Sequence, residues 1–232
     1  YIGDKSGVLY LVHVHSSYIQ TLKRIKKNEE DRIVPFEYFL KFADICSAIY
    51  NIIVAKYSIS KLFFYGYDVT DIIWIELQRS NIVLSHWLMY ESVRNLLKKS
   101  IIKKAYLTYE NIAWENMFIM SMRNNSPLTK IVGYQHTVVP QSATGMFFGT
   151  RESKIKPLPD KILTVGNETK DIMMEYGNYS DKYVVPSCAL RYDYLKSVPT
   201  KPRKKIKTIL LALEGVPEVT RMVNYVLSQA NK

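Results

Sequence analysis

The sequence predicts an α/β protein built on a Rossmann-like parallel sheet with flanking helices. Short apolar segments rich in β-branched and aromatic residues alternate along the chain with longer segments of helical periodicity. With 232 residues, 47% apolar and 23% charged, the chain can bury one large core or two of ordinary size. Strands that alternate with helices favour a parallel sheet, because parallel neighbours need a long crossover connection that is usually a helix.

The predicted strands are runs of Val, Ile, Leu, Phe and Tyr that stop at a glycine, a proline or a polar residue. They cover residues 8–14, 61–66, 104–110, 130–136, 160–166 and 182–187. The predicted helices have apolar residues three or four positions apart. They cover residues 35–57, 68–78, 80–100, 111–125 and 168–177. Asp68 and Ser80 are good N-caps for the second and third helices, and lysines at the end of the third suit its negative pole.

A second domain is predicted near the C-terminus. Residues 1–197 form the N-terminal domain in this interpretation, and the proline-rich, basic stretch 198–207 is a linker. Residues 208–232 then contain a strand, a glycine turn at Gly215 and a helix. One strand and one helix cannot bury a core, so we interpret them as the first βα unit of a second Rossmann-like domain and expect the chain to be part of something longer.

The charge balance favours an anionic partner. The chain has 32 basic and 21 acidic residues, a formal net charge of +11. Acidic residues directly after the basic run 23–27 partly neutralise it, whereas the run 201–207 has no such compensation. That second run lacks interleaved aromatic residues, and no nucleic-acid-binding motif is present, so a nucleic-acid partner is disfavoured. A solvated linker, or attraction to an anionic membrane surface, explains it better.

The sequence favours a cytoplasmic protein without a bound metal. Cys46 and Cys188 are far apart and lack metal-type spacing, which fits a reducing compartment. No uncharged apolar stretch reaches the roughly 18–20 residues of a membrane span, and there is no signal-peptide pattern. His13 and His15 share one face of the first predicted strand, but no third ligand accompanies them, so we do not expect a metal site.

Polar residues stand at the ends of two consecutive predicted strands. Gln135, His136 and Thr137 end one of them, and Glu110 ends the strand before it. Open parallel sheets bind ligands at the carboxyl ends of their strands, so we predict a shared site there. Glu110 or His136 is the candidate general base, and Gln135 and Thr137 are candidate substrate contacts. The structural alternatives are a capping role for Glu110 and a purely structural histidine.

Three further residues are candidates from their local context. Glu115 lies near the start of a predicted helix, where a carboxylate caps the helix or accepts hydrogen bonds from sugar hydroxyls. Arg191 follows the strand 182–187, where it can bind an anionic group or pair with Asp193 or Glu175 on the surface. Gly215 lies at a strand-to-helix turn whose backbone N–H groups can face a phosphate, although one glycine is not a GxGxxG motif.

Four segments together resemble a family of bacterial and archaeal surface-carbohydrate biosynthesis proteins, which look like GT-B glycosyltransferases. The segments are TYENIAWE (108–115), IVGYQHTVVP (131–140), LPDKILTVGNETKDIMMEYG (158–177) and ALRYDYL (189–195). They occur in the order that the family shows. The similarity covers about residues 60–215, and the first 58 residues contribute little to it.

The resemblance implies two Rossmann-like domains facing each other across a cleft, with the acceptor held by the N-terminal domain and a nucleotide sugar by the C-terminal one. This chain would be the acceptor domain with the start of the donor domain. Glu110, Gln135, His136 and Thr137 would line the cleft, Arg191 would lie near the crossover, and Gly215 would approach the donor phosphates. The reaction would need no cofactor beyond the nucleotide sugar, because helix dipoles and basic residues stabilise the leaving phosphate.

The sequence therefore predicts a glycosyltransferase that builds surface polysaccharide on a glycan or lipid-linked acceptor, in the cytoplasm or at the inner membrane face. Two alternatives stay open. A nucleotide-sugar epimerase shares this fold and would yield an isomerised nucleotide sugar without an acceptor. A non-enzymatic basic binding domain would bind its anionic partner with an affinity that falls steeply with salt.

Overall fold

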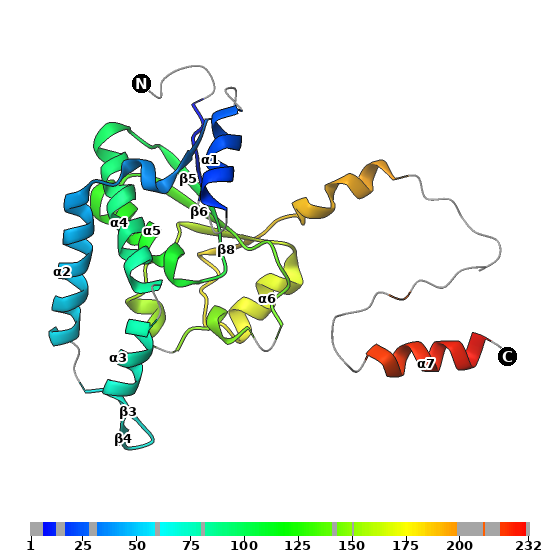
Figure 1. Cartoon of the computed structure of the whole chain (residues 1–232). Helices are drawn as coiled ribbons and strands as arrows, with labels where there is room; N and C mark the ends of the chain where they lie inside the picture. The colour runs from blue at the N-terminus through cyan, green and yellow to red at the C-terminus, as the bar shows by residue number, and fades with distance from the viewer. Residues whose placement is uncertain are drawn as a thin grey trace. The chain divides into compact units, whose positions relative to one another are not determined.

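The computed structural model describes residues 7–12, 17–27, 32–58, 61–79, 82–140, 143–149, 151–198, 211 and 219–230 (Figure 1). The chain divides into two units, Tyr1–Arg191 and Tyr192–Lys232, which are described separately below.

A four-stranded parallel sheet forms the centre of the first unit, as the sequence predicts. Its strands are β5 (Lys104–Thr108), β6 (Lys130–Tyr134), β7 (Lys161–Thr164) and β8 (Val184–Pro186), and they lie in the order β5-β6-β7-β8. The register pairs Thr108 with Tyr134, Tyr134 with Leu163 and Thr164 with Pro186. All four strands therefore end at one edge, which brings the residues after each strand together.

Helices and short 3-10 turns connect these strands. The helix α4 (Ile82–Lys99) precedes β5 and packs on α5 (Ala113–Asn125), which joins β5 to β6. The helix α6 (Asn167–Glu175) joins β7 to β8 and contacts both. The described part of the β6–β7 connection contains only the 3-10 turns η2 (Thr144–Met146) and η3 (Glu152–Lys154). This α/β arrangement, with helices around a parallel sheet, is consistent with a Rossmann-like fold.

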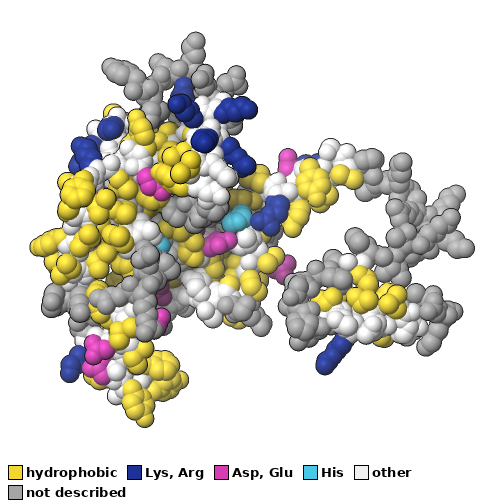
Figure 2. Space-filling view, viewed as in Figure 1, with side chains coloured by type: hydrophobic (Ala, Val, Ile, Leu, Met, Phe, Trp, Pro, Cys, Tyr) yellow, Lys and Arg dark blue, Asp and Glu magenta, His cyan; other side chains and the backbone are white. Residues whose placement is uncertain are grey.

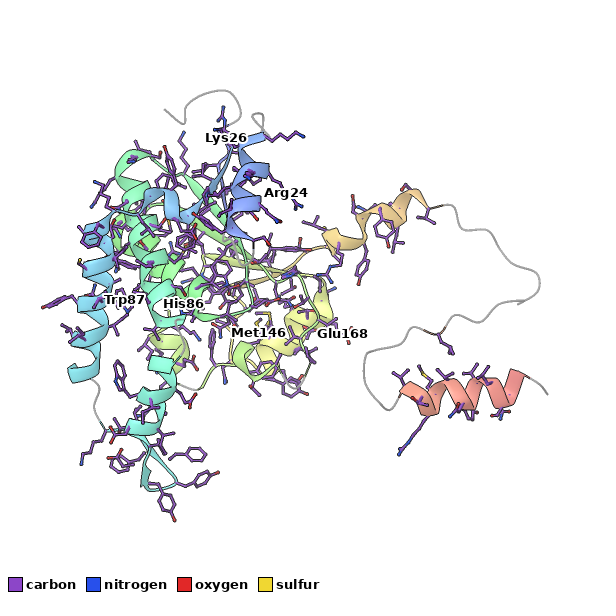
Figure 3. The ribbon with its side chains drawn as sticks, in the orientation of Figure 1. Arg24, Lys26, His86, Trp87, Met146 and Glu168 are labelled. Atoms are coloured by element: carbon purple, nitrogen blue, oxygen red, sulfur yellow. The ribbon has the colours of Figure 1, made fainter. Side chains whose placement is uncertain are left out.

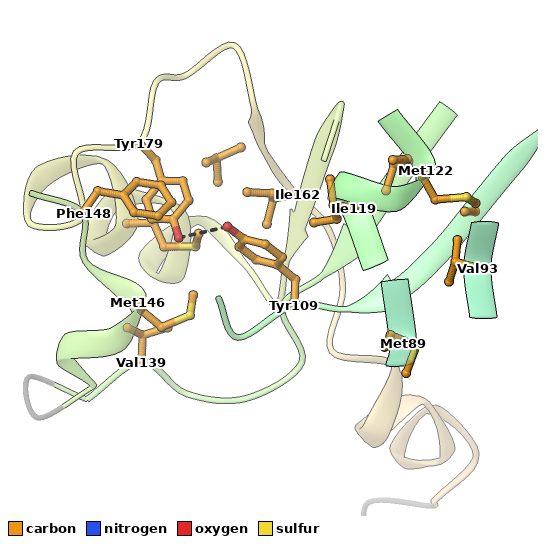
Figure 4. Packing of buried hydrophobic residues seen from close by; sticks show 14 of the residues in the cluster. Met89, Val93, Tyr109, Ile119, Met122, Val139, Met146, Phe148, Ile162 and Tyr179 are labelled. Carbon is orange, nitrogen blue, oxygen red and sulfur yellow. Dashed lines mark hydrogen bonds between the residues drawn. The ribbon is translucent and has the colours of Figure 1, made fainter. Parts of the chain in front are cut away.

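The core fills the space between the sheet and these connections. Tyr109, at the end of β5, is fully buried, and its hydroxyl lies 3.3 Å from that of Tyr179 (Figure 4). Phe148 packs against the Tyr179 ring at a tilt of 37°, with a centroid separation of 4.3 Å. The same cluster includes Met89, Val93, Ala105, Ile119, Met122, Ile131, Met146, Ile162, Met173 and Val184. Side chains from β5, β6, β7 and β8 thus anchor one continuous core.

The N-terminal strand prediction is correct only in part. The strand β1 (Tyr10–Val12) pairs in parallel with β2 (Ile33–Pro35), and these two strands form a separate two-stranded sheet. Between them lies the helix α1 (Tyr18–Lys27), which we did not predict. A dense run of basic residues hides the helical spacing of its apolar residues, so we interpreted the segment only as a charge cluster.

The helix predicted over 35–57 begins later than expected. Pro35 ends β2, a 3-10 turn η1 (Phe36–Phe39) follows, and the helix α2 covers only Phe42–Ser58. Leu40 has an extended backbone with φ −80° and ψ 146°, which interrupts the helical path. Apolar spacing continues through this interruption, so periodicity alone cannot show it.

The strand predicted over 61–66 is not part of the parallel sheet. It is one arm of an antiparallel hairpin, β3 (Phe63–Phe64) and β4 (Tyr67–Asp68). Tyr65 and Gly66 have φ values of 49° and 85°, the positive values that a tight two-residue hairpin turn requires. The helix α3 (Thr70–Arg79) follows, capped by the Asp68 carboxylate, which accepts a hydrogen bond from the Thr70 N–H at 3.0 Å.

The second unit contains most of the 3-10 segment η4 (Leu190–Ser197) and the helix α7 (Val219–Ala230). The predicted linker 198–207, apart from Val198, and the predicted strand and turn before α7, apart from Leu211, lie outside the described residues. Gly215, His13 and His15 lie outside them as well. Among the helices in the described ranges, none is long and apolar enough to cross a membrane.

Candidate active site

The backbone at the carboxyl edge of the sheet continues the strand ladder for one residue beyond each strand. The Tyr109 N–H donates to the Tyr134 carbonyl at 2.9 Å, and the Gln135 N–H donates to the Leu163 carbonyl at 2.8 Å. These hydrogen bonds hold the segments after β5 and β6 side by side. Glu110 and His136 follow directly on this rigid backbone, so their positions are set by the sheet.

Glu110, His136 and Thr137 form one polar cluster at this edge. The His136 Nε2 lies 3.7 Å from Glu110 Oε1, and the Thr137 Oγ1 lies 3.5 Å from the same oxygen. Both the Glu110 and His136 side chains are partly exposed, at 40% and 30%. Figure 2 shows a histidine beside an acidic side chain on the visible face. These residues therefore lie close together at the carboxyl edge of the sheet, as we predicted from the sequence.

The partly exposed Glu110 carboxylate and His136 ring leave one side of the cluster open to a ligand. The His136 Nδ1 is buried and has no hydrogen-bond partner among the described residues. The Glu110 carboxylate is in contact with solvent, and only long contacts connect it to its neighbours. A carboxylate can accept a proton from a hydroxyl group, and a neighbouring imidazole can form a hydrogen bond with the same group. The other described histidine, His86, belongs to α4 (Figure 3).

Gln135 supports the turn that carries this cluster. Its side chain is buried, and its Nε2 donates to the Thr137 carbonyl at 2.5 Å, with a longer contact to the Thr137 hydroxyl at 3.4 Å. The amide thus closes the short turn that carries His136. The Gln135 Oε1 is buried without a hydrogen-bond partner in the described structure. This position favours a role in shaping the turn over the direct substrate contact that we predicted.

Glu115 occupies the first turn of α5 and is fully buried. Its two oxygens each accept a hydrogen bond from the Glu110 N–H at 3.0 Å, and Oε2 also accepts one from the Ile112 N–H at 3.1 Å. Burial raises the pKa of Glu115 to about 7, although the hydrogen bonds from the Glu110 and Ile112 backbone oppose this shift. Glu115 is therefore placed to hold the loop that carries Glu110, which fits the capping alternative better than substrate contact.

Two further residues form hydrogen bonds at this edge, Asn111 and Tyr134, and neither was among the candidates that we predicted from the sequence. Asn111 has φ +60°, and its Nδ2 donates to the Gly145 carbonyl at 2.5 Å, which ties the loop after β5 to η2. The Tyr134 hydroxyl donates to the Cys188 carbonyl and accepts from the Leu190 N–H, both at 2.9 Å. An Asn after a strand is a signal for this backbone, because Asn tolerates positive φ. The Tyr134 link depends on a contact 54 residues away in sequence.

The structure describes no contact between Arg191 and this cluster, and Gly215 lies outside the described residues. Arg191 is exposed and forms no ion pair with another described residue. Asp193, one of its two predicted alternative partners, pairs instead with Lys196. No group of three or more His, Cys, Asp or Glu residues in the described ranges is arranged to hold a metal ion.

A basic recess lies at the opposite edge of the sheet. It has a volume of about 360 Å³, and its lining includes Arg123, Lys154, Lys156, Asp160 and Lys182. Two of its cations already have partners: Arg123 lies 3.2 Å from Asp160, and Lys156 lies 2.8 Å from Glu152. The recess is the described feature that most favours the alternative of a basic binding domain.

Comparison of this chain with protein-family models, with curated proteins and with solved structures gave no significant match.

Proposed function

We propose that this protein is a glycosyltransferase of the GT-B type, which transfers a sugar from a nucleotide sugar to a surface-polysaccharide acceptor. The observation that carries the proposal is the pairing of Glu110 with His136 at the carboxyl edge of a parallel sheet. This edge is where open α/β sheets bind their ligands. The resemblance of the segments around both residues to surface-carbohydrate biosynthesis proteins supports the choice of reaction.

In an inverting reaction, Glu110 is the base. The acceptor hydroxyl oxygen forms a bond to the anomeric carbon, the bond from that carbon to the nucleotide phosphate breaks, and the hydroxyl proton moves to the Glu110 carboxylate. His136, 3.7 Å away, accepts a hydrogen bond from the acceptor. The Thr137 hydroxyl orients the same Glu110 oxygen. In a retaining reaction no such base is required.

A transfer assay tests the proposal. The protein is incubated with a panel of nucleotide sugars and oligosaccharide or lipid-linked acceptors, and the products are identified by mass spectrometry. Glu110→Gln preserves the shape of the side chain but removes the base, so we expect kcat to fall by about 10²- to 10⁴-fold with little change in KM. Glu175→Gln, at an exposed position at the end of α6, is the matched control and should retain full activity.

The products also separate the alternatives. An isomerised nucleotide sugar without acceptor glycosylation would replace the proposal with the epimerase alternative. Equal activity of Glu110→Gln and the unaltered protein would remove Glu110 from the chemistry. Absence of any turnover, with salt-sensitive binding of polyanions, would favour the basic binding domain.

A further inference from the structure

The helix α2 has its polar side turned inward and its apolar side turned outward. Its buried or half-buried positions include Asp44, Ser47, Ala48 and Asn51. Its exposed positions between 42 and 54 carry no charge: they are Phe42, Ala43, Ile45, Cys46, Ile49, Tyr50, Ile53 and Val54. Helices on the surface of water-exposed proteins show the opposite pattern. We call these eight residues the α2 stripe.

Specific contacts hold the polar side of α2 against α4. The Asp44 carboxylate accepts a hydrogen bond from Asn95 Nδ2 at 2.8 Å and lies 3.3 Å from Arg94. The Ser47 hydroxyl donates to Glu91 Oε1 at 3.1 Å, and Arg94 also pairs with Glu91. Rotating α2 to bury its apolar side would break this network and leave charges unpaired. The outward position of the stripe is therefore fixed by the packing.

The hairpin that follows α2 adds exposed aromatic rings. Phe63, Phe64, Tyr65 and Tyr67 are all exposed, and Tyr65 reaches 88%. The contact between the Phe64 and Tyr65 rings, at 4.6 Å, does not remove them from solvent. In Figure 1 the hairpin lies beyond the end of α2, away from the sheet, and Figure 2 shows hydrophobic side chains over both regions on one face. Exposed apolar patches of this kind indicate an interaction surface.

We propose that the α2 stripe and the β3–β4 hairpin bind the surface of an anionic lipid bilayer. Helices in contact with lipid turn their charges toward the protein and their apolar side chains outward, as α2 does. Aromatic rings such as those of the hairpin are favoured at the boundary between headgroups and acyl chains. Exposed Lys41 and Lys61 flank α2, and the net charge of +11 attracts the chain to anionic headgroups.

The geometry is that of a helix lying on the membrane. The 17 residues of α2 span only about 25 Å, and no described helix is long and apolar enough to cross a bilayer. The proposal places exposed Asp68 and Asp71, at the base of the hairpin, on the aqueous side. The proposal does not use the basic run 201–207, which lies outside the described residues, and it does not depend on the proposed enzymatic activity.

Vesicle flotation with the full chain tests the proposal. We expect binding to vesicles of phosphatidylcholine and phosphatidylglycerol at 7:3, and weaker binding to phosphatidylcholine alone. Replacing Ile49 and Ile53 together by Glu should lower the bound fraction at least tenfold. The control replaces Ile101 and Leu128 by Glu; they are exposed at 95% and 90% and belong to neither the α2 stripe nor the hairpin. It introduces the same charge and should retain at least half of the binding.

The two native cysteines provide a second measurement. Cys46 belongs to the α2 stripe, and Cys188 lies at the carboxyl edge of the sheet; both are exposed and unpaired. With the other cysteine replaced by Ser, each is labelled with an environment-sensitive fluorophore. Addition of anionic vesicles should shift the emission at Cys46 to shorter wavelength and leave the emission at Cys188 unchanged.

Three results would overturn the proposal. The first is absence of flotation with both kinds of vesicle, and the second is equal binding by the two double variants. The third is a dimer, measured by light scattering without lipid, that only the Ile49 and Ile53 substitutions dissociate. That result would show that a second copy of the chain covers the stripe.

Discussion

Glu115 shows how one buried carboxyl group can control the geometry of the candidate site. Its oxygens accept hydrogen bonds from the backbone N–H groups of Glu110 and Ile112, and these bonds hold the loop that carries Glu110. Burial disfavours the charged form of the carboxyl group, and its pKa rises from 4.5 to about 7. The fold therefore binds the Glu115 proton about 3 kcal/mol more tightly than the unfolded chain does.

This difference predicts a pH dependence of stability. The group stabilises the fold fully below pH 4.5, and this contribution is lost as the pH rises from 4.5 through about 7. We expect the free energy of unfolding of Glu115→Gln, relative to that of the unaltered protein, to increase by about 3 kcal/mol over this interval. Urea unfolding at a series of pH values measures it. If the free energies of unfolding of the two proteins change with pH by the same amount, Glu115 does not cause the pH dependence.

At the scale of single elements, β6 organises both the core and the site. It lies between β5 and β7, and its last residues lead directly into Gln135 and His136. Gly133 lies within β6 where the Tyr109 side chain crosses it. A Cβ at this position would lie 2.8 Å from Tyr109 Cβ and 3.2 Å from Pro159 Cγ. Tyr109 Cβ is bonded to the backbone and cannot move aside, so the strand needs glycine here.

Gly133→Ala is therefore expected to destabilise the protein by about 1–3 kcal/mol, the range typical of overpacked cores. The matched control is Gly145→Ala, because a Cβ at Gly145 meets no atom within 4 Å. Urea unfolding of both variants measures the difference. Equal free energies of unfolding for the two variants would mean that β5 and β6 can move slightly apart without loss of stability.

At the scale of the whole molecule, the chain combines a compact sheet unit with a large positive charge and much exposed apolar surface. The sheet unit extends from Tyr1 to Arg191 and contains both cysteines. Cys46 and Cys188 are both exposed free thiols at well-separated positions in the sequence. Cys46 lies on α2 and Cys188 follows β8, so their reactivity reports on two different parts of the same unit.

Thiol titration with Ellman's reagent should yield two reactive groups per chain in the native protein, and the same number after denaturation. Exposure makes both sulfur atoms accessible to the reagent. The variants Cys46→Ser and Cys188→Ser should each yield one. A native thiol at position 46 that reacts only after denaturation would show that the α2 stripe is covered in solution.

Much of the sheet was predictable because each of its strands has a local signature. Val, Ile and Tyr runs ending in polar residues marked β5 to β8, and neighbouring parallel strands placed Glu110 beside His136. The hairpin β3–β4 was missed because its residues match a buried strand in composition. The separate pairing of β1 with β2 was missed because β2 has only three residues and adjoins a helical pattern.

Local chemistry along the chain was sufficient to indicate the α/β class, the parallel sheet and the edge at which Glu110, His136 and Thr137 gather, since these follow from residue type and strand direction. Contacts between distant residues set the rest. They bury Glu115 and Gln135, link Tyr134 to the segment after β8, and turn the apolar side of α2 outward. Whether a side chain is buried depends on which element packs against its side of the helix or strand. Local sequence periodicity does not contain that information.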